Sequence, residues 1–166
     1  MRARAHAMLN SPMLSISIRE ATVGDIPEIV RHRRAMYEAM DYQDADALSA
    51  MESTTAEYLP RAIANGSFCA WFAVAGERVA GGAAVLVSPW PCHPYDQECR
   101  RATILNMYVY PEFRRQGIAR RLMHTMIEWC RQQHFAGVFL HASKSGRPLY
   151  ESLGFEPTTE MSLRLR

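Results

Sequence analysis

The segment 102–130 limits the fold more than any other part of the chain, because its apolar spacing changes at one point. Residues 102–109 have the composition of a strand, which Pro111 ends. From Ile118 onward, apolar side chains recur every three or four residues, as they do on one face of a helix. Residues 114–119, with a glycine among them, join the two patterns. The segment therefore predicts a strand, a glycine-containing turn and an amphipathic helix in direct succession.

The rest of the chain interleaves strand and helix patterns without an internal repeat. The other predicted strands are 14–19, 68–75, 79–87, 138–141 and 161–165. The other predicted helices are 26–40, one from Ser53 or Thr54 to Asn65 that Pro60 is expected to kink or split, and 147–153. Thr22 and Asp25 have the spacing of a capping box before the first helix. The proline-rich stretch 88–101 is expected to be a loop.

The charge balance is too even to imply an obligatory polyanionic partner. The chain has 166 residues, with 19 basic and 17 acidic side chains and a net charge of +2. Such a balance favours neither nucleic acid nor an anionic membrane surface. With 48% hydrophobic residues, the chain suits one domain with a substantial core. We expect a small-molecule or peptide partner, no nucleic acid and no membrane.

The cysteines and the N-terminal residues bear on location. Cys69, Cys92, Cys99 and Cys130 lack CxxC pairs and are too sparse for the disulfide framework of a small secreted domain. Reduced thiols in the cytoplasm are therefore expected. Residues 1–13 show no sustained apolar run. They are expected to form a flexible tail before a domain at 14–166.

The predicted turn has the chemistry of an anion site. The first amides of a helix have no acceptors within it, so they attract anions together with the helix dipole. Gly117 allows close approach of a backbone or an unusual dihedral, and Arg114 and Arg115 add positive charge. A glycine before a helix is also common in purely structural turns. The turn suits a diphosphate, but it lacks the GxxxxGK[ST] and GxGxxG patterns of nucleotide-binding proteins.

Two motifs in register carry a resemblance to a known family. Arg114, Gly117 and Ala119 match the acetyl-CoA motif of the GNAT N-acetyltransferase superfamily: Arg or Gln, two residues, Gly, one residue, then Gly or Ala. Downstream, 146–155 resembles the family's tyrosine-bearing helix and its closing Gly-Phe. The resemblance covers about 14–165. It implies a mixed α/β (α+β) single domain with a mainly antiparallel six- or seven-stranded sheet. Helices would cover both faces, and the fourth and fifth strands would splay apart.

The resemblance also implies roles for individual residues. Tyr150 would be the general acid that protonates the departing CoA thiolate, a role that a phenol can fill; the alternative is core packing. The strand 107–109 would pair with the pantetheine arm, and an amide near Val109 would hold the thioester oxygen. Ser143 stands where many relatives have asparagine. The cofactor-binding set implied by the resemblance is Met107, Tyr108, Val109, Arg114, Arg115, Gln116, Gly117, Ile118, Ala119 and Ser143.

The general base has no obvious candidate. Asn106 cannot accept a proton as a carboxylate would. His141, His93 and Glu112 are candidate ends of a water relay, although a lone histidine is more often structural. Cys92, His93 and Cys99 lack a second paired ligand set, so no metal is expected.

The acidic residues between the first two predicted helices bear on the acceptor. Between 35 and 60 the chain has six carboxylates and no lysine or arginine, which favours a small cationic amine or simply a solvated surface. Aromatic residues that wall the pocket or pack in the core are Tyr37, Tyr42, Trp90 and Tyr95. The expected reaction is direct transfer of acetyl from acetyl-CoA to a primary amine. A non-catalytic acyl-CoA sensor is the alternative, a nucleotide-binding protein is a weaker one, and homodimers are common in the resembling family.

Overall fold

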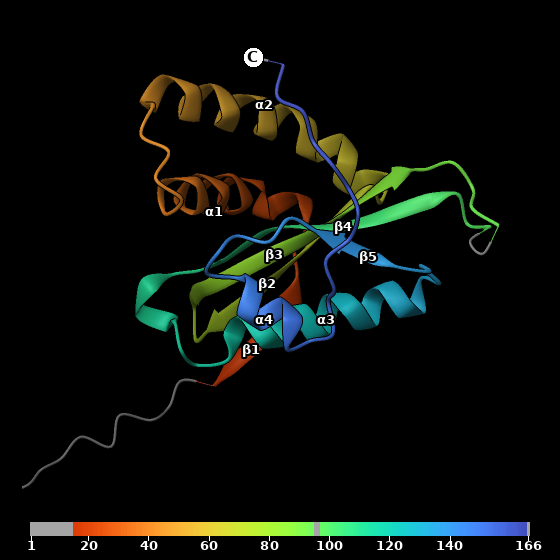
Figure 1. Cartoon of the computed structure of the whole chain (residues 1–166). Coiled ribbons are helices and arrows are strands. Elements are labelled where there is room, and N and C mark those ends of the chain that lie inside the picture. The colour runs from red at the N-terminus through yellow and green to blue at the C-terminus, as the bar shows by residue number, and fades with distance from the viewer. Residues whose placement is uncertain (1–14, 95–96, 166) are drawn as a thin grey trace, which may run out of the picture.

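A single five-stranded sheet, in the order β1-β2-β3-β4-β5, forms the centre of the molecule (Figure 1). The computed structural model describes residues 15–94 and 97–165. The strands are β1 (Ile16–Glu20), β2 (Phe68–Ala75), β3 (Arg78–Pro89), β4 (Arg100–Val109) and β5 (Val138–Leu140). The helices are η1 (Val23–Asp25), α1 (Ile26–Glu38), α2 (Ala45–Ala64), η2 (Pro111–Phe113), α3 (Ile118–Gln132) and α4 (Arg147–Glu151). Neighbouring strands are antiparallel except β4 and β5, which are parallel. The mixed, mainly antiparallel α/β fold is confirmed.

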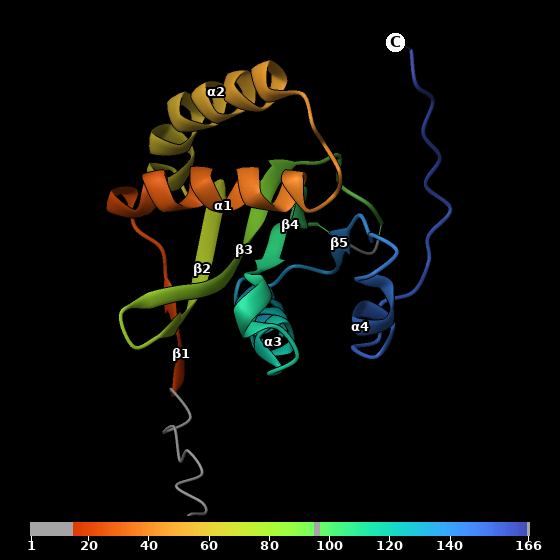
Figure 2. The same cartoon turned by 90° about the vertical axis from the view of Figure 1, so that its left-hand side faces the viewer.

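Helices cover both faces of the sheet, as predicted. α1 and α2 lie over one face and α3 over the other (Figures 1 and 2). The α3 side buries the apolar stripe predicted from Ile118, with Leu122, Met123 and Met126 almost fully enclosed. The other side buries Leu59 of α2 and Phe72 of β2 in a second cluster. The sheet is therefore a shared wall between two apolar layers.

β4 and β5 part after three residue pairs. Their register runs from Ala102↔Val138 to Ile104↔Leu140, while β4 continues to Val109 beside β3 alone. Figure 2 shows β5 and α4 standing apart from the end of β4. Over residues 105–109, the edge of β4 opposite β3 thus has no strand beside it among the described residues, as the resemblance implied.

A bulge bends β4 just where this separation begins. The β3–β4 register shifts between Gly82 and Ala84, and Asn106 has a positive φ of 57°. Asparagine adopts this left-handed conformation more readily than most residues do. Such a bulge re-aims side chains and increases local twist. It therefore determines which β4 side chains face α1.

The second helix is longer than predicted. It begins at Ala45, because the Asp44 carboxylate accepts hydrogen bonds from the amides of Asp46 (3.1 Å) and Ala47 (3.0 Å). The start predicted at Ser53 or Thr54 is wrong, since both hydroxyls bond to carbonyls one turn earlier inside the helix. Pro60 lies within α2 and does not split it. The capping box of Thr22 and Asp25 is confirmed.

The strand count is lower than expected, because 161–165 forms no strand. The exposed fractions of Met161, Leu163 and Leu165 are 94%, 83% and 87%. The segment that follows α4 runs past the edge of β5 toward the level of α2 (Figure 1). Alternating apolar residues give a segment strand character, but a strand also needs a partner edge.

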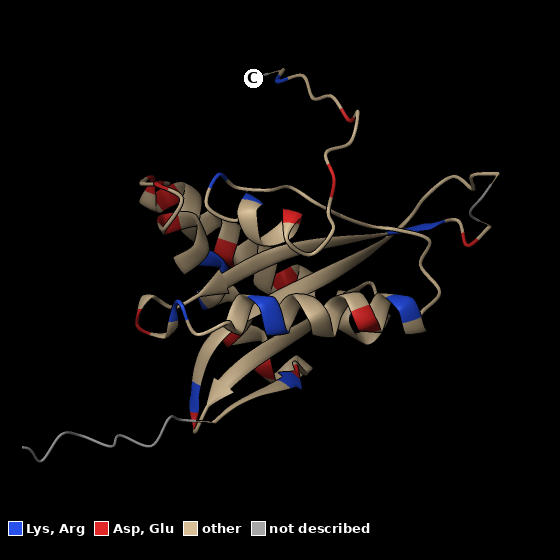
Figure 3. Cartoon of the chain, turned by 60° about the horizontal axis from the view of Figure 1, so that its bottom comes forward, with Lys and Arg blue, Asp and Glu red and all other residues tan. Residues whose placement is uncertain are grey.

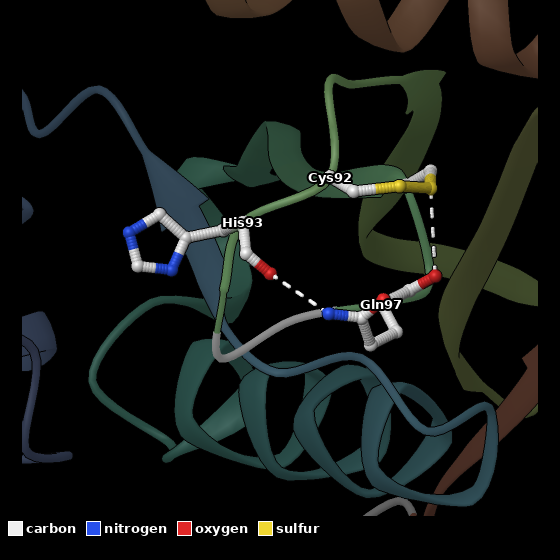
Figure 4. Close-up of a disulfide and its surroundings, with 4 residues drawn as sticks. Cys92, His93 and Gln97 are labelled. Atoms are coloured by element: carbon white, nitrogen blue, oxygen red, sulfur yellow. Dashed lines mark hydrogen bonds between the residues drawn. A yellow bond between two sulfur atoms is a disulfide. The ribbon is translucent and has the colours of Figure 1, made fainter.

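The structure also corrects the prediction that all four thiols are reduced. Cys92 and Cys99 form a disulfide at the base of the β3–β4 loop (Figure 4). The hairpin brings them together, with Trp90 donating its amide to the carbonyl of Cys99 at 2.8 Å. Cys69 and Cys130 are free. Seven-residue spacing alone does not reveal such a pair, because the pairing depends on the strand register beyond Pro89.

Two predictions lie partly or wholly outside the described residues. The expected tail 1–13 is one of them, and Tyr95 of the expected aromatic wall is the other. Within the described ranges, no helix combines the length and the apolar character needed to cross a membrane.

Candidate functional site

The turn before α3 has the backbone geometry expected of an anion site. Gly117 is the N-cap with φ 74°, and Arg115 also has a positive φ of 63°. The Arg121 amide donates to the Gly117 carbonyl at 3.1 Å, so the amides at positions 118–120 precede the first bond of the helix. The first turn of α3 contains no acidic residue. Nothing lies within 4 Å of a Cβ built on Gly117, which leaves this face of the turn open.

Arg114 ties the turn to the end of β4. Its Nε donates to the carbonyl of Val109 at 2.9 Å, and its guanidinium lies 5.5 Å from the centroid of the Tyr108 ring. Gln116 reaches back to the Glu112 carbonyl at 3.5 Å. The Arg114 side chain thus holds the turn in place, and it occupies one backbone carbonyl of the strand predicted to face pantetheine.

The unpaired end of β4 lies directly before this turn. Met107 and Val109 pack against the α3-side core, while Tyr108 faces α1. A Cβ on Gly81 would come within 2.8 Å of the Tyr108 carbonyl and 3.0 Å of Val109 Cγ2. Glycine at this position therefore lets β3 approach β4 closely at residues 108–109, which belong to the strand predicted to bind pantetheine.

Tyr150 lies on α4, 8% exposed, with its ring 6.1 Å from that of Phe155. Burial raises the pKa of its phenol, so the group stays protonated at neutral pH and is suited to donating a proton. A Cβ on Gly146 would lie 2.8 Å from Tyr150 Cε2. Gly146 is thus the space into which this ring fits, a requirement that the sequence motif alone did not reveal.

Ser143 shapes the turn that leads into α4. Its hydroxyl accepts a hydrogen bond from the Gly146 amide at 3.1 Å and lies 3.2 Å from the Ser145 hydroxyl. Its carbonyl accepts the Arg147 amide at 3.0 Å. The side chain predicted to contact a cofactor is therefore also a local capping group.

A cavity of about 780 Å³ borders Tyr150 and has all three residues of β5 in its walls. Its walls include His141, Arg147 and residues of the extended C-terminal segment. The β4 residues that line it are Thr103, which pairs with Phe139 of β5, and Arg101, which precedes the first β4–β5 pair. The cavity therefore borders Tyr150, while residues 105–109 at the unpaired end of β4 are not part of its walls.

Comparison with known proteins agrees with the family resemblance of the two motifs. The model of the acetyltransferase (GNAT) family matches residues 29–155, most of the chain. The chain belongs to the GNAT acetyltransferase family. The region matched includes the turn, the unpaired β4 end and Tyr150.

Relatives of this GNAT chain include human proteins. Human N-acetyltransferase 8 is 31% identical over 121 residues, which is 71% of this chain and 50% of that protein. Human N-acetyltransferase 8B is 32% identical over 120 residues, 70% of this chain and 49% of that protein. The chain thus spans about half the length of the curated relatives it matches.

Solved structures match over nearly their whole length. A GCN5-related N-acetyltransferase from Ralstonia eutropha JMP134 has a TM-score of 0.83 and 34% identity, covering 91% of this chain and 99% of that one. A predicted acetyltransferase with acetyl-CoA from Clostridium acetobutylicum has a TM-score of 0.83 and 25% identity, covering 91% and 97%.

On the α1 face of the GNAT sheet, sequence reasoning missed His32. It is 2% exposed, and its Nε2 donates to the Gly82 carbonyl at 3.2 Å. Its ring makes edge contacts with Phe72, Tyr108 and Tyr110. Burial lowers its pKa to about 4, so His32 is neutral at pH 7 and links α1 to the bulged strand. Only its place on the inner stripe of α1 could have signalled this role.

Asn106, at the bulge, is 5% exposed and meets α1 as well. Its Oδ1 accepts a hydrogen bond from Arg33 Nη1, and Arg33 Nη2 donates to the Tyr37 hydroxyl at 3.2 Å. The Arg33 guanidinium lies 5.0 Å from the centroid of the Tyr37 ring. A cation, an amide and a phenol therefore gather beside the unpaired β4 end.

The structure separates the candidate ends of a proton relay. Glu112 forms an ion pair with Arg78 at 2.6 Å. His141 is exposed just after β5, and His93 lies in the β3–β4 loop. Among the described residues, no group of three or more His, Cys, Asp or Glu side chains could hold a metal ion. These three residues do not form one cluster, and the base stays unassigned.

The predicted aromatic wall is only partly assembled. Tyr37 and Tyr42 are in edge contact, with ring centroids 5.2 Å apart. Trp90 lies instead over Arg101, 4.7 Å from the guanidinium, at the other end of the sheet's long strands. The two tyrosines remain beside α1, where Tyr37 also contacts Arg33.

We expect His32 to make stability depend on pH. Its pKa in the folded state, about 4, lies below its usual 6.5. The unfolded chain therefore binds the proton more readily, and stability is lost as the pH falls from about 6.5 to about 4. The full loss is about 3 kcal/mol. Urea unfolding across this range measures it, and His32→Gln should flatten the slope.

Two features separate this effect from other titrations. Arg19 holds the pKa of the Asp25 carboxyl well below its usual 3.8, so the contribution of Asp25 is lost only below that value. His124 is exposed on α3, and His124→Gln is the matched control that should leave the slope unchanged. An equal slope in His32→Gln and the unmodified protein would contradict the assignment.

Proposed function

We propose that this chain is an acetyl-CoA-dependent N-acetyltransferase that acts on a primary amine. The observation that carries the proposal is the junction of the unpaired β4 end with the open turn at Gly117. The pantetheine arm of acetyl-CoA would lie along the edge of β4, and its diphosphate would bind at the N-terminus of α3, which follows that edge. Membership of the GNAT family and the similarity to a Clostridium acetyltransferase solved with acetyl-CoA support the choice of ligand.

The binding residues act mainly through their backbone. The amides of Gly117, Ile118 and Ala119 would donate to the diphosphate, and Arg115 and Gln116 lie on the exposed side of the turn to assist. The edge of β4 at 107–109 would pair with the pantetheine amides. A β4 amide would donate to the thioester oxygen, where negative charge develops during acyl transfer.

Tyr150 would be the proton donor. Acetyl-CoA supplies a thioester whose acetyl group passes to the amine while its sulfur leaves as a thiolate. The buried, protonated phenol of Tyr150 would give that sulfur its proton. Ser143 would contact the cofactor with the hydroxyl that also orders the turn before α4.

The acidic residues between 35 and 60 support a small cationic amine as acceptor only in part. Arg34 pairs with both Glu38 (2.8 Å) and Glu52 (2.7 Å), and Asp44 caps α2. These three carboxylates therefore stabilise the helical layer. Asp and Glu positions near the junction of α1 and α2 are red in Figure 3, and the exposed carboxylates among them would draw a small cationic amine by their potential.

A non-catalytic acyl-CoA sensor is the second candidate. It is favoured by the absence of an assigned base and by the local role of the Ser143 hydroxyl. We also propose a cytoplasmic location and allow for a homodimer. The free thiols of Cys69 and Cys130 suit that location, whereas the Cys92–Cys99 disulfide does not.

Saturating acetyl-CoA should stabilise the protein. A ligand at 100 times its Kd adds about 2.7 kcal/mol, or about 5–10 °C in Tm for a domain of this size. Thermal unfolding with and without acetyl-CoA measures the shift, and ATP at the same concentration is the control. No shift with acetyl-CoA, in protein purified free of CoA, would overturn the proposal.

Replacing Tyr150 with Phe should reduce turnover about 100-fold or more, because the sulfur loses its proton donor while the ring packing is kept. CoA release with a panel of primary amines measures turnover. The acetyl-CoA thermal shift should persist in the variant. Full turnover would remove Tyr150 from the mechanism, and an unmodified protein that binds acetyl-CoA but acetylates no amine would favour the sensor.

Gly146→Ala should impair turnover through the same ring. The new methyl group would sit 2.8 Å from Tyr150 Cε2 and 3.2 Å from the Ser143 hydroxyl, so the phenol must shift. We expect kcat to fall about 10-fold or more, with acetyl-CoA binding retained. Gly24→Ala is the control, because its methyl group would meet only ordinary contact at 3.5 Å. Equal loss in both variants would count against a specific effect on Tyr150.

A further inference from the structure

Three arginines on α1 differ in their partners. Arg31 pairs with Glu28, and Arg34 pairs with Glu38 and Glu52. Arg33 points to the sheet and has no carboxylate partner in the described part of the chain. Its hydrogen bonds go to two neutral groups, the Asn106 amide oxygen and the Tyr37 hydroxyl.

The guanidinium of Arg33 is left with unused capacity. It is half-buried, and its Nε is enclosed without a hydrogen-bond partner among the described residues. An arginine offers five N–H donors in a planar fork that matches a carboxylate with two bonds. A shielded cation without a counter-charge costs free energy, which a bound anion would offset. The group is therefore suited to an oxyanion that arrives with a ligand.

The position of Arg33 indicates which ligand brings that anion. Asn106 immediately precedes Met107, the first residue of the strand edge proposed to hold the thioester arm. The diphosphate turn lies beyond the other end of this edge, after Val109. Phosphates of the cofactor would therefore bind away from Arg33. The acceptor, which must approach the acyl group, is the remaining source of an anion.

We propose that Arg33 binds a carboxylate of the acceptor, so that the substrate is an amine that also carries a carboxylate, such as an α-amino acid. This inference rests on the proposed acetyltransferase function and gives the acceptor its chemical class. The ammonium group of such a zwitterion agrees with the cationic amine inferred from the acidic stretch. Tyr37 orients the guanidinium, and Asn106 fixes its distance from β4.

The experiment compares α-amino acids with their amides as acceptors. Glycine, alanine, phenylalanine and glutamate, each with its α-amide, are tested for CoA release at saturating acetyl-CoA. The unmodified protein should prefer the acids about 10-fold to 100-fold in kcat/KM. The amine of an amide is less basic and more often neutral, which biases this comparison against the proposal.

Arg33→Met should bring the acid-to-amide ratio close to 1 by raising the KM of the acids, with little change for the amides. Arg33→Lys should recover part of the preference, because it keeps the charge but not the planar fork. Arg31→Met removes an exposed arginine that already has a partner and should leave the ratio unchanged. The acetyl-CoA thermal shift should be the same in all variants.

Other outcomes overturn the inference without affecting the proposed function. The first is equal kcat/KM for acids and amides in the unmodified protein, and the second is an unchanged acid-to-amide ratio in Arg33→Met. The third is an equal loss of kcat/KM for acids and amides in Arg33→Met, which would mean that Arg33 only supports the bulge. If neither these acceptors nor the panel of other primary amines is turned over, the proposed function fails. Calorimetric titration of N-acetylglycine into the CoA-saturated protein then decides: binding lost in Arg33→Met supports the carboxylate site, and no binding overturns it.

Discussion

The early end of the β4–β5 pairing is the constraint on which the rest of the structure depends. Three parallel pairs hold the strands together, and beyond Ile104↔Leu140 they diverge. Backbone amides and carbonyls at an open edge need partners, from water or from a ligand. Because β4 ends at Val109 and α3 begins at Ile118, the donors of the strand are followed along the chain by the donors of the helix. One interruption of the sheet thus leaves an unpaired strand edge and a helix N-terminus joined by a short segment of chain.

Beyond Ile104, β4 has no pairing with β5. Side chains of α1 hold this part of the strand instead, on one face of the sheet. The bulge at Asn106 turns this side chain and Tyr108 toward α1. His32 fills the space between them as a neutral ring with one hydrogen bond to β3. A charged group would be far more costly there. The helix therefore supports the open strand through aromatic contacts, and it carries Arg33 to the rim of the same strand.

Sequence reasoning predicted those parts of the fold that depend on local patterns. The apolar stripe from Ile118 and the turn at Gly117 could be recognised because periodicity and glycine chemistry are properties of neighbouring residues. The start of α2, the Cys92–Cys99 disulfide and the missing strand at 161–165 could not. Each depends on competition between several possible caps or on which distant edge lies nearby. His32 and Gly146 were missed for the same reason, since their roles are contacts with β4 and with Tyr150.

The charges near the proposed acceptor site show how sequence clustering misleads. The acidic stretch is dense along the chain, but Glu38 and Glu52 neutralise Arg34 and Asp44 caps a helix. A single arginine directly after a buried histidine is inconspicuous in the sequence. Residues four apart lie on one side of a helix, so Arg33 shares a side of α1 with Tyr37, and its hydrogen bond to Asn106 shows that this side meets β4. An uncompensated charge at a strand edge constrains a substrate more than a larger number of charges that already have partners.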